Sequence, residues 1–91
     1  MTPREGEYAV KLLLSRNGTE SIVRLSNGAA LRVLNIVPGR DAGDEFDHIS
    51  TNIADAHVDR ESDFFYASEV REIATEDGTV LFRSTTTEIS N

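Results

Sequence analysis

Residues 8–33, YAVKLLLSRNGTESIVRLSNGAALRV, contain two Asn-Gly dipeptides, Asn17-Gly18 and Asn27-Gly28, set between segments rich in aliphatic side chains. Asn-Gly is strongly preferred in tight hairpin turns because both residues tolerate a positive φ. Aliphatic segments joined by such turns are typical of antiparallel strands. The stretch therefore predicts three consecutive strands, a β-meander.

The register at each turn can be checked against the apolar pattern. A two-residue turn at Asn17-Gly18 places Leu12 opposite Val23 and Val10 opposite Leu25, all on one face. The strand before this turn is thus expected to contribute to the core.

The second turn is expected to have three residues, 26–28, with Gly28 in the left-handed bulge position. This register places Leu31 opposite Val23 and puts Val33 on the same apolar face. A two-residue turn would instead place Arg32 opposite Val23, so the bulged turn is preferred.

The C-terminal half contains a third turn dipeptide, Asp77-Gly78. As a two-residue turn it predicts three cross-strand pairs, namely Thr75 with Val80, Ile73 with Phe82 and Glu72 with Arg83. Alternation in HISTNI, residues 48–53, predicts a further short strand. Residues 62–73 predict a strand that bends near Ala67-Ser68, with a short helix as the alternative.

These elements predict an all-β fold of five or six strands, arranged as a meander, a roll or a partly open SH3-like or Sm-like barrel. The alternative is an α+β fold with one short helix near residues 62–73. Residues 1–91 are expected to form a single small domain because the chain is too short for two cores. The polar residues 85–91 are expected to fray.

Composition excludes several classes of protein. The chain has no cysteine, which removes disulfides, thiol nucleophiles and thiolate metal sites. It has no apolar run long enough for a membrane span, and its first residues do not resemble a signal peptide. We therefore expect a cytoplasmic protein with no membrane partner. Its core is small, so self-association into a homo-oligomer would add to its stability.

Charge is unevenly distributed along the chain. The net charge is −7, yet residues 1–40 hold six bases and three acids, whereas residues 41–77 hold twelve acids and two bases. Such a bipolar chain can orient on a basic protein, and its acidic region repels nucleic acid.

The most acidic short run is PGRDAGDEFDH, residues 38–48. This run offers oxygen and nitrogen ligands for a divalent cation in Asp41, Asp44, Asp47 and His48. Further ligands could come from His57 and Asp59 downstream. The spacing does not follow the EF-hand scheme, and turn-rich acidic loops are typically solvated. We therefore predict no metal and no cofactor here.

Catalytic motifs are not recognisable either. The sequence has no GxSxG nucleophile elbow and no glycine-rich phosphate loop, and no serine or histidine is singled out by its context. We predict that the protein is not an enzyme and has no catalytic residues.

The expected function is a non-catalytic protein-binding module whose acidic surface docks a basic protein, of which an inhibitor that mimics nucleic acid would be a narrower form. The predicted partner-binding residues combine carboxylates with aromatic anchors: Asp41, Asp44, Glu45, Phe46, Asp47, Asp59, Asp63, Phe64 and Phe65.

The alternative function is a small-barrel nucleic-acid-binding protein. The register of the first hairpin places Lys11 opposite Arg24, with Arg32 one strand further, on the face opposite the core. Together with a stacked aromatic residue, this basic face could bind a nucleic acid strand. The acidity of the whole chain argues against it.

Overall fold

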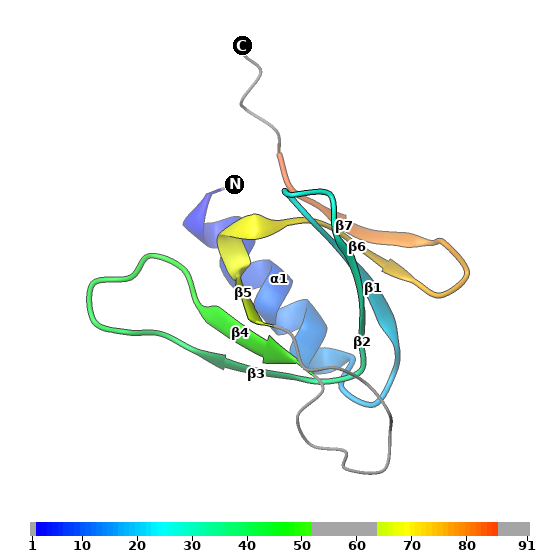
Figure 1. The fold of residues 1–91 in the computed structure, drawn as a ribbon, viewed down its shortest axis with the longest axis horizontal. Coiled ribbons are helices and arrows are strands. Elements are labelled where there is room, and N and C mark those ends of the chain that lie inside the picture. The colour runs from blue at the N-terminus through cyan, green and yellow to red at the C-terminus, as the bar shows by residue number, and fades with distance from the viewer. Residues whose placement is uncertain (1, 52–63, 86–91) are drawn as a thin grey trace.

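The structure is a computed structural model that describes residues 2–51 and 64–85. Within these two ranges, one α-helix precedes seven short strands, and a 3-10 turn separates the fifth and sixth strands (Figure 1). The elements are α1 (Pro3–Ser15), β1 (Ser21–Leu25), β2 (Ala30–Val33), β3 (Ile36–Gly39), β4 (His48–Thr51), β5 (Phe64–Tyr66), η1 (Ala67–Glu69), β6 (Val70–Thr75) and β7 (Val80–Arg83).

The strands form two antiparallel sheets. One has four strands in the order β2-β1-β6-β7, and the other has three in the order β3-β4-β5. Two chain segments connect the sheets, because β2 leads into β3 and β5 leads through η1 into β6 (Figure 1). The sheets are not closed into a barrel, so the fold is mostly β with one helix rather than an all-β barrel.

Helix α1 replaces the first predicted strand. The Thr2 hydroxyl accepts a hydrogen bond from the Glu5 N–H, and the Glu5 carboxylate accepts one from the Thr2 N–H, which is a capping box. Pro3 follows the cap, where its missing N–H costs nothing. Buried side chains recur at helical spacing, at Gly6, Ala9, Val10 and Leu13. The prediction of a hairpin at residues 17–18 is therefore wrong, and so are the Leu12–Val23 and Val10–Leu25 pairs.

The second hairpin is as predicted. Val23 pairs with Leu31, and the Leu25 N–H donates to the Ala29 carbonyl across a three-residue turn. Gly28 has a φ of 92°, the left-handed conformation that the bulge position requires. Val33 is buried on the same face as Val23, as the register predicted.

The third hairpin is confirmed in part. Glu72 pairs with Arg83 and Ile73 with Phe82, but Ala74 rather than Thr75 pairs with Val80. The turn has three residues, since the Thr75 N–H donates to the Thr79 carbonyl at 2.8 Å. A bulge between Ile73 and Ala74 then restores the predicted register for Ile73 and Glu72. The Thr75 hydroxyl and the Thr79 N–H both donate hydrogen bonds to the Asp77 carboxylate. These bonds, of which the one from Thr75 has the larger effect, hold the pKa of the Asp77 carboxyl below its ordinary value.

The segment from residue 64 onward is a strand that bends at residues 67–69 through one 3-10 turn, as predicted. The structure is compatible with the alternative α+β description, but its helix is α1 and not a short helix near residues 62–73. The predicted strand at residues 48–53 is β4, in which Ile49 and Thr51 are buried and the side chains alternate. Its predicted last residues, 52–53, lie outside the described residues.

The core lies where α1 packs against η1, β3 and β6. The helix contributes Ala9, Val10 and Leu13 to one cluster with side chains from both sheets, among them Val23, Ile49, Phe65 and Ile73. Within the described ranges, no helix is long and apolar enough to cross a membrane.

The two ends of the described chain are joined at Glu5. Its carboxylate accepts hydrogen bonds from the Thr85 hydroxyl at 3.0 Å and from the Thr85 N–H at 3.3 Å. Thr85 is therefore hydrogen-bonded to α1. The predicted fraying of residues 85–91 stays a prediction, because residues 86–91 lie outside the described residues.

The register of β5 predicts opposite outcomes for two adjacent phenylalanines. Phe65 is 2% exposed and Phe64 is 60% exposed. We expect Phe65→Ala to lower the free energy of unfolding by about 3–5 kcal/mol and Phe64→Ala by less than about 1 kcal/mol, as measured by urea denaturation. Phe65→Leu serves if the alanine variant does not fold. Equal effects of the two alanine variants would contradict this register.

The Glu5 contacts predict a pH-dependent contribution to stability. The hydrogen bond from the Thr2 N–H is the main reason that the pKa of the Glu5 carboxyl lies below its ordinary value of 4.5. Partial burial raises this pKa, and the hydrogen bonds from Thr85 lower it further. Since the folded pKa is the lower one, the stabilisation is complete above the unfolded pKa and is lost as the pH falls through the folded value. We expect Glu5→Gln to cost about 0.3–1 kcal/mol at pH 7 and nothing once the carboxyl is protonated.

Urea denaturation at neutral and acidic pH measures this difference, with Glu7→Gln as the control because Glu7 is an exposed carboxylate two residues away on the same helix. A cost of Glu5→Gln that does not change with pH would contradict the role of the charge.

Candidate functional site

Side chains alternate across the three-stranded sheet. Ile49 and Phe65, which pair across β4 and β5, point into the core and are fully or almost fully buried. Their neighbours in the chain therefore point outward. We call this outer surface the aromatic face and define it by Val37, His48, Phe64 and Tyr66.

Three rings of the aromatic face contact one another. The His48 ring stacks on Phe64 at a centroid distance of 5.7 Å, and Tyr66 meets Phe64 edge to face at 5.6 Å. The rings are nevertheless open to solvent, because Phe64 is 60% and Tyr66 40% exposed. Val37, at 51% exposed, extends the apolar surface onto β3. The sheet thus presents a preformed aromatic patch.

His48 lies flat on the sheet because its cross-strand partner is Gly39. A Cβ atom at Gly39 would lie 2.6 Å from the His48 Nε2 atom, so a side chain there would displace the imidazole. The glycine therefore helps to set the orientation of the ring.

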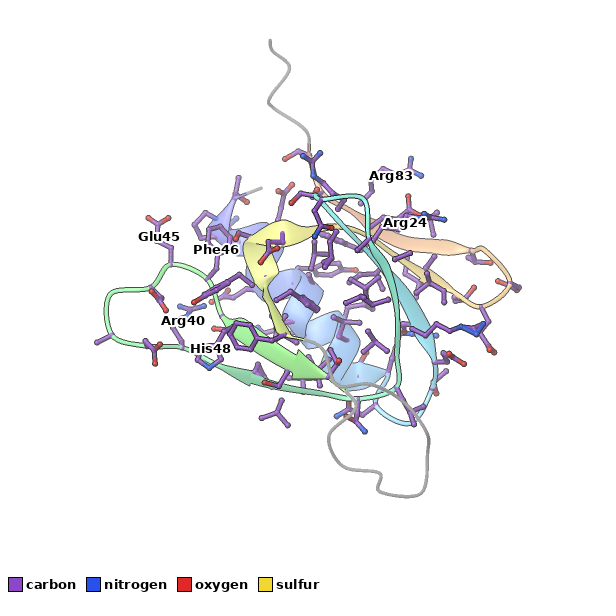
Figure 2. All side chains as sticks on the ribbon, in the orientation of Figure 1. Arg24, Arg40, Glu45, Phe46, His48 and Arg83 are labelled. Atoms are coloured by element: carbon purple, nitrogen blue, oxygen red, sulfur yellow. The ribbon has the colours of Figure 1, made fainter. Side chains whose placement is uncertain are left out.

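The loop between β3 and β4, residues 40–47, places carboxylates at one end of the aromatic face. The Arg40 guanidinium pairs with Asp47 at 2.8 Å, closing the loop, and the Asp44 N–H donates to the Asp41 carbonyl in a turn. The Asp47 carbonyl accepts from the Ala67 N–H at 2.9 Å, which attaches the loop to η1. Figure 2 shows Arg40, Glu45, Phe46 and His48 gathered on this side of the molecule.

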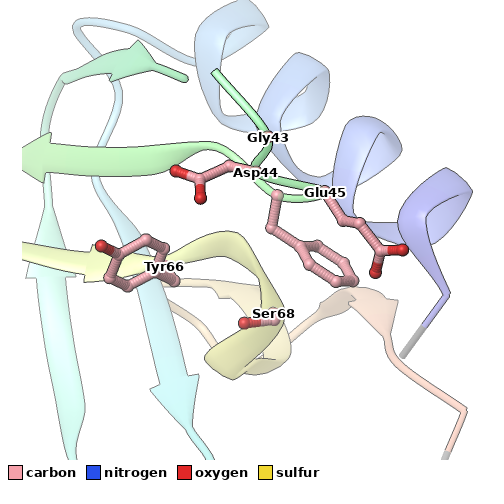
Figure 3. Close-up of a pocket in the computed structure, with 6 residues that line it drawn as sticks. Gly43, Asp44, Glu45, Tyr66 and Ser68 are labelled. Atoms are coloured by element: carbon pink, nitrogen blue, oxygen red, sulfur yellow. The ribbon is translucent and has the colours of Figure 1, made fainter. Parts of the chain in front are cut away.

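A shallow hollow of about 260 Å³ lies between the loop and the chain that follows β5. Its lining combines aromatic, acidic and small residues: Gly43, Asp44, Glu45, Phe46, Tyr66 and Ser68. In Figure 3 the Asp44 carboxylate lies beside the Tyr66 ring, whereas Glu45 extends away from Tyr66.

Phe46 fixes the hollow to the core. Its ring packs against Gly6 of α1, where a Cβ atom would lie 2.7 Å from the ring carbon Cδ1. Partial burial of Phe46 against the core cluster means that it is a wall of the hollow rather than a free anchor.

The structure brings together most of the described residues that were predicted to bind a partner. Asp41, Asp44, Glu45, Phe46 and Asp47 share the loop, and Phe64 lies on the adjoining sheet face. Phe65 is buried in the core and is not available as an anchor, contrary to the prediction. Asp59 and Asp63 lie outside the described residues, as does His57.

The partner-binding residues predicted from the sequence did not include Val37 and His48, and the prediction did not separate the outward aromatic residues Phe64 and Tyr66 from the buried Phe65. The missing signal was the two-residue period of a strand: once Phe65 is assigned to the core, Phe64 and Tyr66 must face outward together. Val37 and His48 then follow from strand pairing, which the sequence alone did not fix.

The predicted basic face is divided between elements. Lys11 is on α1 and does not pair with Arg24, so that predicted pair is wrong. Arg24 lies 3.6 Å from Glu72, which also pairs with Arg83 at 3.0 Å, and Arg32 lies 3.3 Å from Glu20. Figure 2 shows Arg24 and Arg83 together on the four-stranded sheet. Carboxylates therefore accompany the arginines of this face.

One group could hold a metal ion among the described residues. Ligand atoms of Asp41, Asp44 and His48 lie within 4.8 Å of one another, with Asp41 exposed. Three ligands leave at least half of the coordination sphere of Mg²⁺ or Ca²⁺ to water. This chemistry allows weak cation binding and does not define a structural metal centre.

Comparison with known proteins gives no assignment: no family model, no curated protein and no solved structure matches the chain.

The sequence predicts no metal, and the incomplete ligand set predicts only weak binding. Titration with Mn²⁺, followed by line broadening in ¹H–¹⁵N NMR spectra, should show no saturation at residues 41–48 below about 1 mM, because three partly solvated ligands replace few waters. Tight saturable broadening that disappears in His48→Gln would contradict this prediction.

Proposed function

We propose that this chain is a non-catalytic protein-binding module that docks a basic protein segment on the aromatic face and the adjoining 40–47 loop. The observation that carries the proposal is the meeting of exposed aromatic rings with carboxylates that lack a cationic partner among the described residues. A cytoplasmic location and the absence of catalysis are parts of the same proposal.

The aromatic face provides the apolar part of such an interface. Phe64 and Tyr66 are held by contacts with His48 and with each other, so little side-chain freedom is left to be lost on binding. Aromatic side chains of this kind are enriched among the residues that dominate binding energy.

The loop provides the charge. Arg40 is paired with Asp47, which leaves Asp41, Asp44 and Glu45 without an ion pair in the described part of the chain. Carboxylates at the rim of an apolar patch raise the association rate with a basic partner and favour it over an acidic one. An inhibitor that mimics nucleic acid would use the same carboxylates and is the narrower form of the proposal.

The nucleic-acid-binding alternative has weaker support. Glu72 and Glu20 lie beside the arginines that it requires, and they would have to release them or remain near the phosphates at an electrostatic cost. We therefore propose protein binding and make nucleic acid binding an outcome of the test.

Selection of a random peptide library on the wild-type protein tests the proposal. We expect enriched peptides to combine arginine or lysine with apolar residues, and to bind more weakly in high salt. Phe64→Ala should reduce their affinity at least about tenfold, measured by fluorescence anisotropy, because it removes an exposed aromatic anchor.

Val80→Ala is the matched control, since Val80 is a 42% exposed apolar residue on the other sheet. No enrichment of basic peptides, or equal binding by the Phe64 and Val80 variants, would contradict the proposal. Binding of a single-stranded oligonucleotide that is lost in Arg24→Gln with Arg32→Gln would favour the alternative. A Phe64-dependent dimer in sedimentation would show that a second copy covers the face instead.

A further inference from the structure

The hollow beside the aromatic face has the composition of a site for one planar cation. We infer that it takes a single arginine side chain of the basic partner, with the guanidinium between Tyr66 and the Asp44 carboxylate. This inference rests on the proposed function and assigns the partner's anchoring residue.

The walls of the hollow suit the two parts of an arginine. The Tyr66 ring, 40% exposed, offers its surface to a stacked guanidinium, an arrangement that combines cation–π attraction with planar contact. Phe46 lines the hollow from the core side and can cover the aliphatic stem of the arginine.

The charge is placed beside the aromatic wall. The Asp44 carboxylate lies next to Tyr66 in Figure 3, and the Ser68 hydroxyl completes the polar lining. A carboxylate can accept two parallel N–H bonds from a guanidinium, which a lysine ammonium cannot supply. Glu45 extends away and adds a second negative charge at the rim.

The size of the hollow limits the ligand. At about 260 Å³ and open to solvent, it is smaller than the pockets of roughly 300–1,000 Å³ that enclose drug-sized molecules. It therefore fits the end of one side chain presented by a larger partner better than a whole metabolite.

The arginine of the same loop does not fill this role. Arg40 is in the same loop, yet its guanidinium is 2.8 Å from Asp47 and 42% exposed. Asp44 and Glu45 have no cationic partner among residues 2–51 and 64–85, so an incoming arginine has no internal competitor there.

The direct test uses N-acetyl-arginine methylamide as the probe and ¹H–¹⁵N NMR as the readout. We expect saturable shifts at Gly43, Asp44 and Ser68, and no such shifts with the uncharged isostere N-acetyl-citrulline methylamide. Asp44→Asn should weaken the arginine probe at least about tenfold, as loss of a charge-assisted bidentate pair predicts. Glu7→Gln is the control for loss of one negative charge. Absence of arginine-specific shifts would overturn the inference.

A second arm separates this inference from the proposed function. In a peptide enriched on the wild-type protein, each arginine is replaced in turn by citrulline and by lysine. At one position, replacement by citrulline should lower the affinity about tenfold or more, and replacement by lysine should lower it less. The loss of affinity caused by citrulline should be smaller when the protein carries Asp44→Asn. If peptide binding requires Phe64 but no arginine of the peptide depends on Asp44, the proposed binding module stands and the arginine site is overturned. Failure to enrich any peptide would contradict the binding module. The N-acetyl-arginine methylamide titration would still show whether the hollow binds an arginine side chain.

Discussion

The packing of α1 against both sheets is the contact on which the rest of the structure depends. Two short sheets of three and four strands have few side chains of their own with which to cover each other. The helix supplies Ala9, Val10 and Leu13 to the shared core and approaches the β3–β4 loop closely at Gly6, where the Phe46 ring occupies the space of a side chain. Because this contact uses the inner faces, binding has only the outer faces and loops available.

The outer faces of the two sheets differ in how many of their charged side chains have partners of opposite charge among the described residues. On the four-stranded sheet, Glu72 lies between Arg24 and Arg83, so charges of opposite sign are already matched across the strands. On the three-stranded sheet most outward side chains are aromatic or aliphatic, with Ser50 among them, and the adjoining carboxylates Asp44 and Glu45 have no ion pair among the described residues. The second face therefore has more to gain from a partner, which is the physical basis for placing function there.

Turns were predictable from the sequence, whereas the helix was not recognised. Gly28 and Gly78 both have positive φ in the hairpins that their dipeptides predicted. Asn17-Gly18 has the same chemistry, but Gly18 instead follows the C-terminus of α1, and the Asn17 side chain accepts a hydrogen bond from the Ile36 N–H. The aliphatic residues at 10–14 fit a strand as well as a helix; the capping box at residues 2–5 was the signal that could distinguish them.

The candidate site shows what composition can and cannot predict. The acidity of residues 41–47 indicated a charged surface, but composition does not show that Arg40 pairs with Asp47, while Asp44 has no ion pair among the described residues. Nor does it place Tyr66 beside that loop, since this contact depends on the pairing of β4 with β5 and on the hydrogen bond from Ala67 to Asp47. The pairing that buries Phe65 is the same pairing that exposes Tyr66 beside the carboxylates. A change in this register would therefore remove both the core contact and the binding surface together.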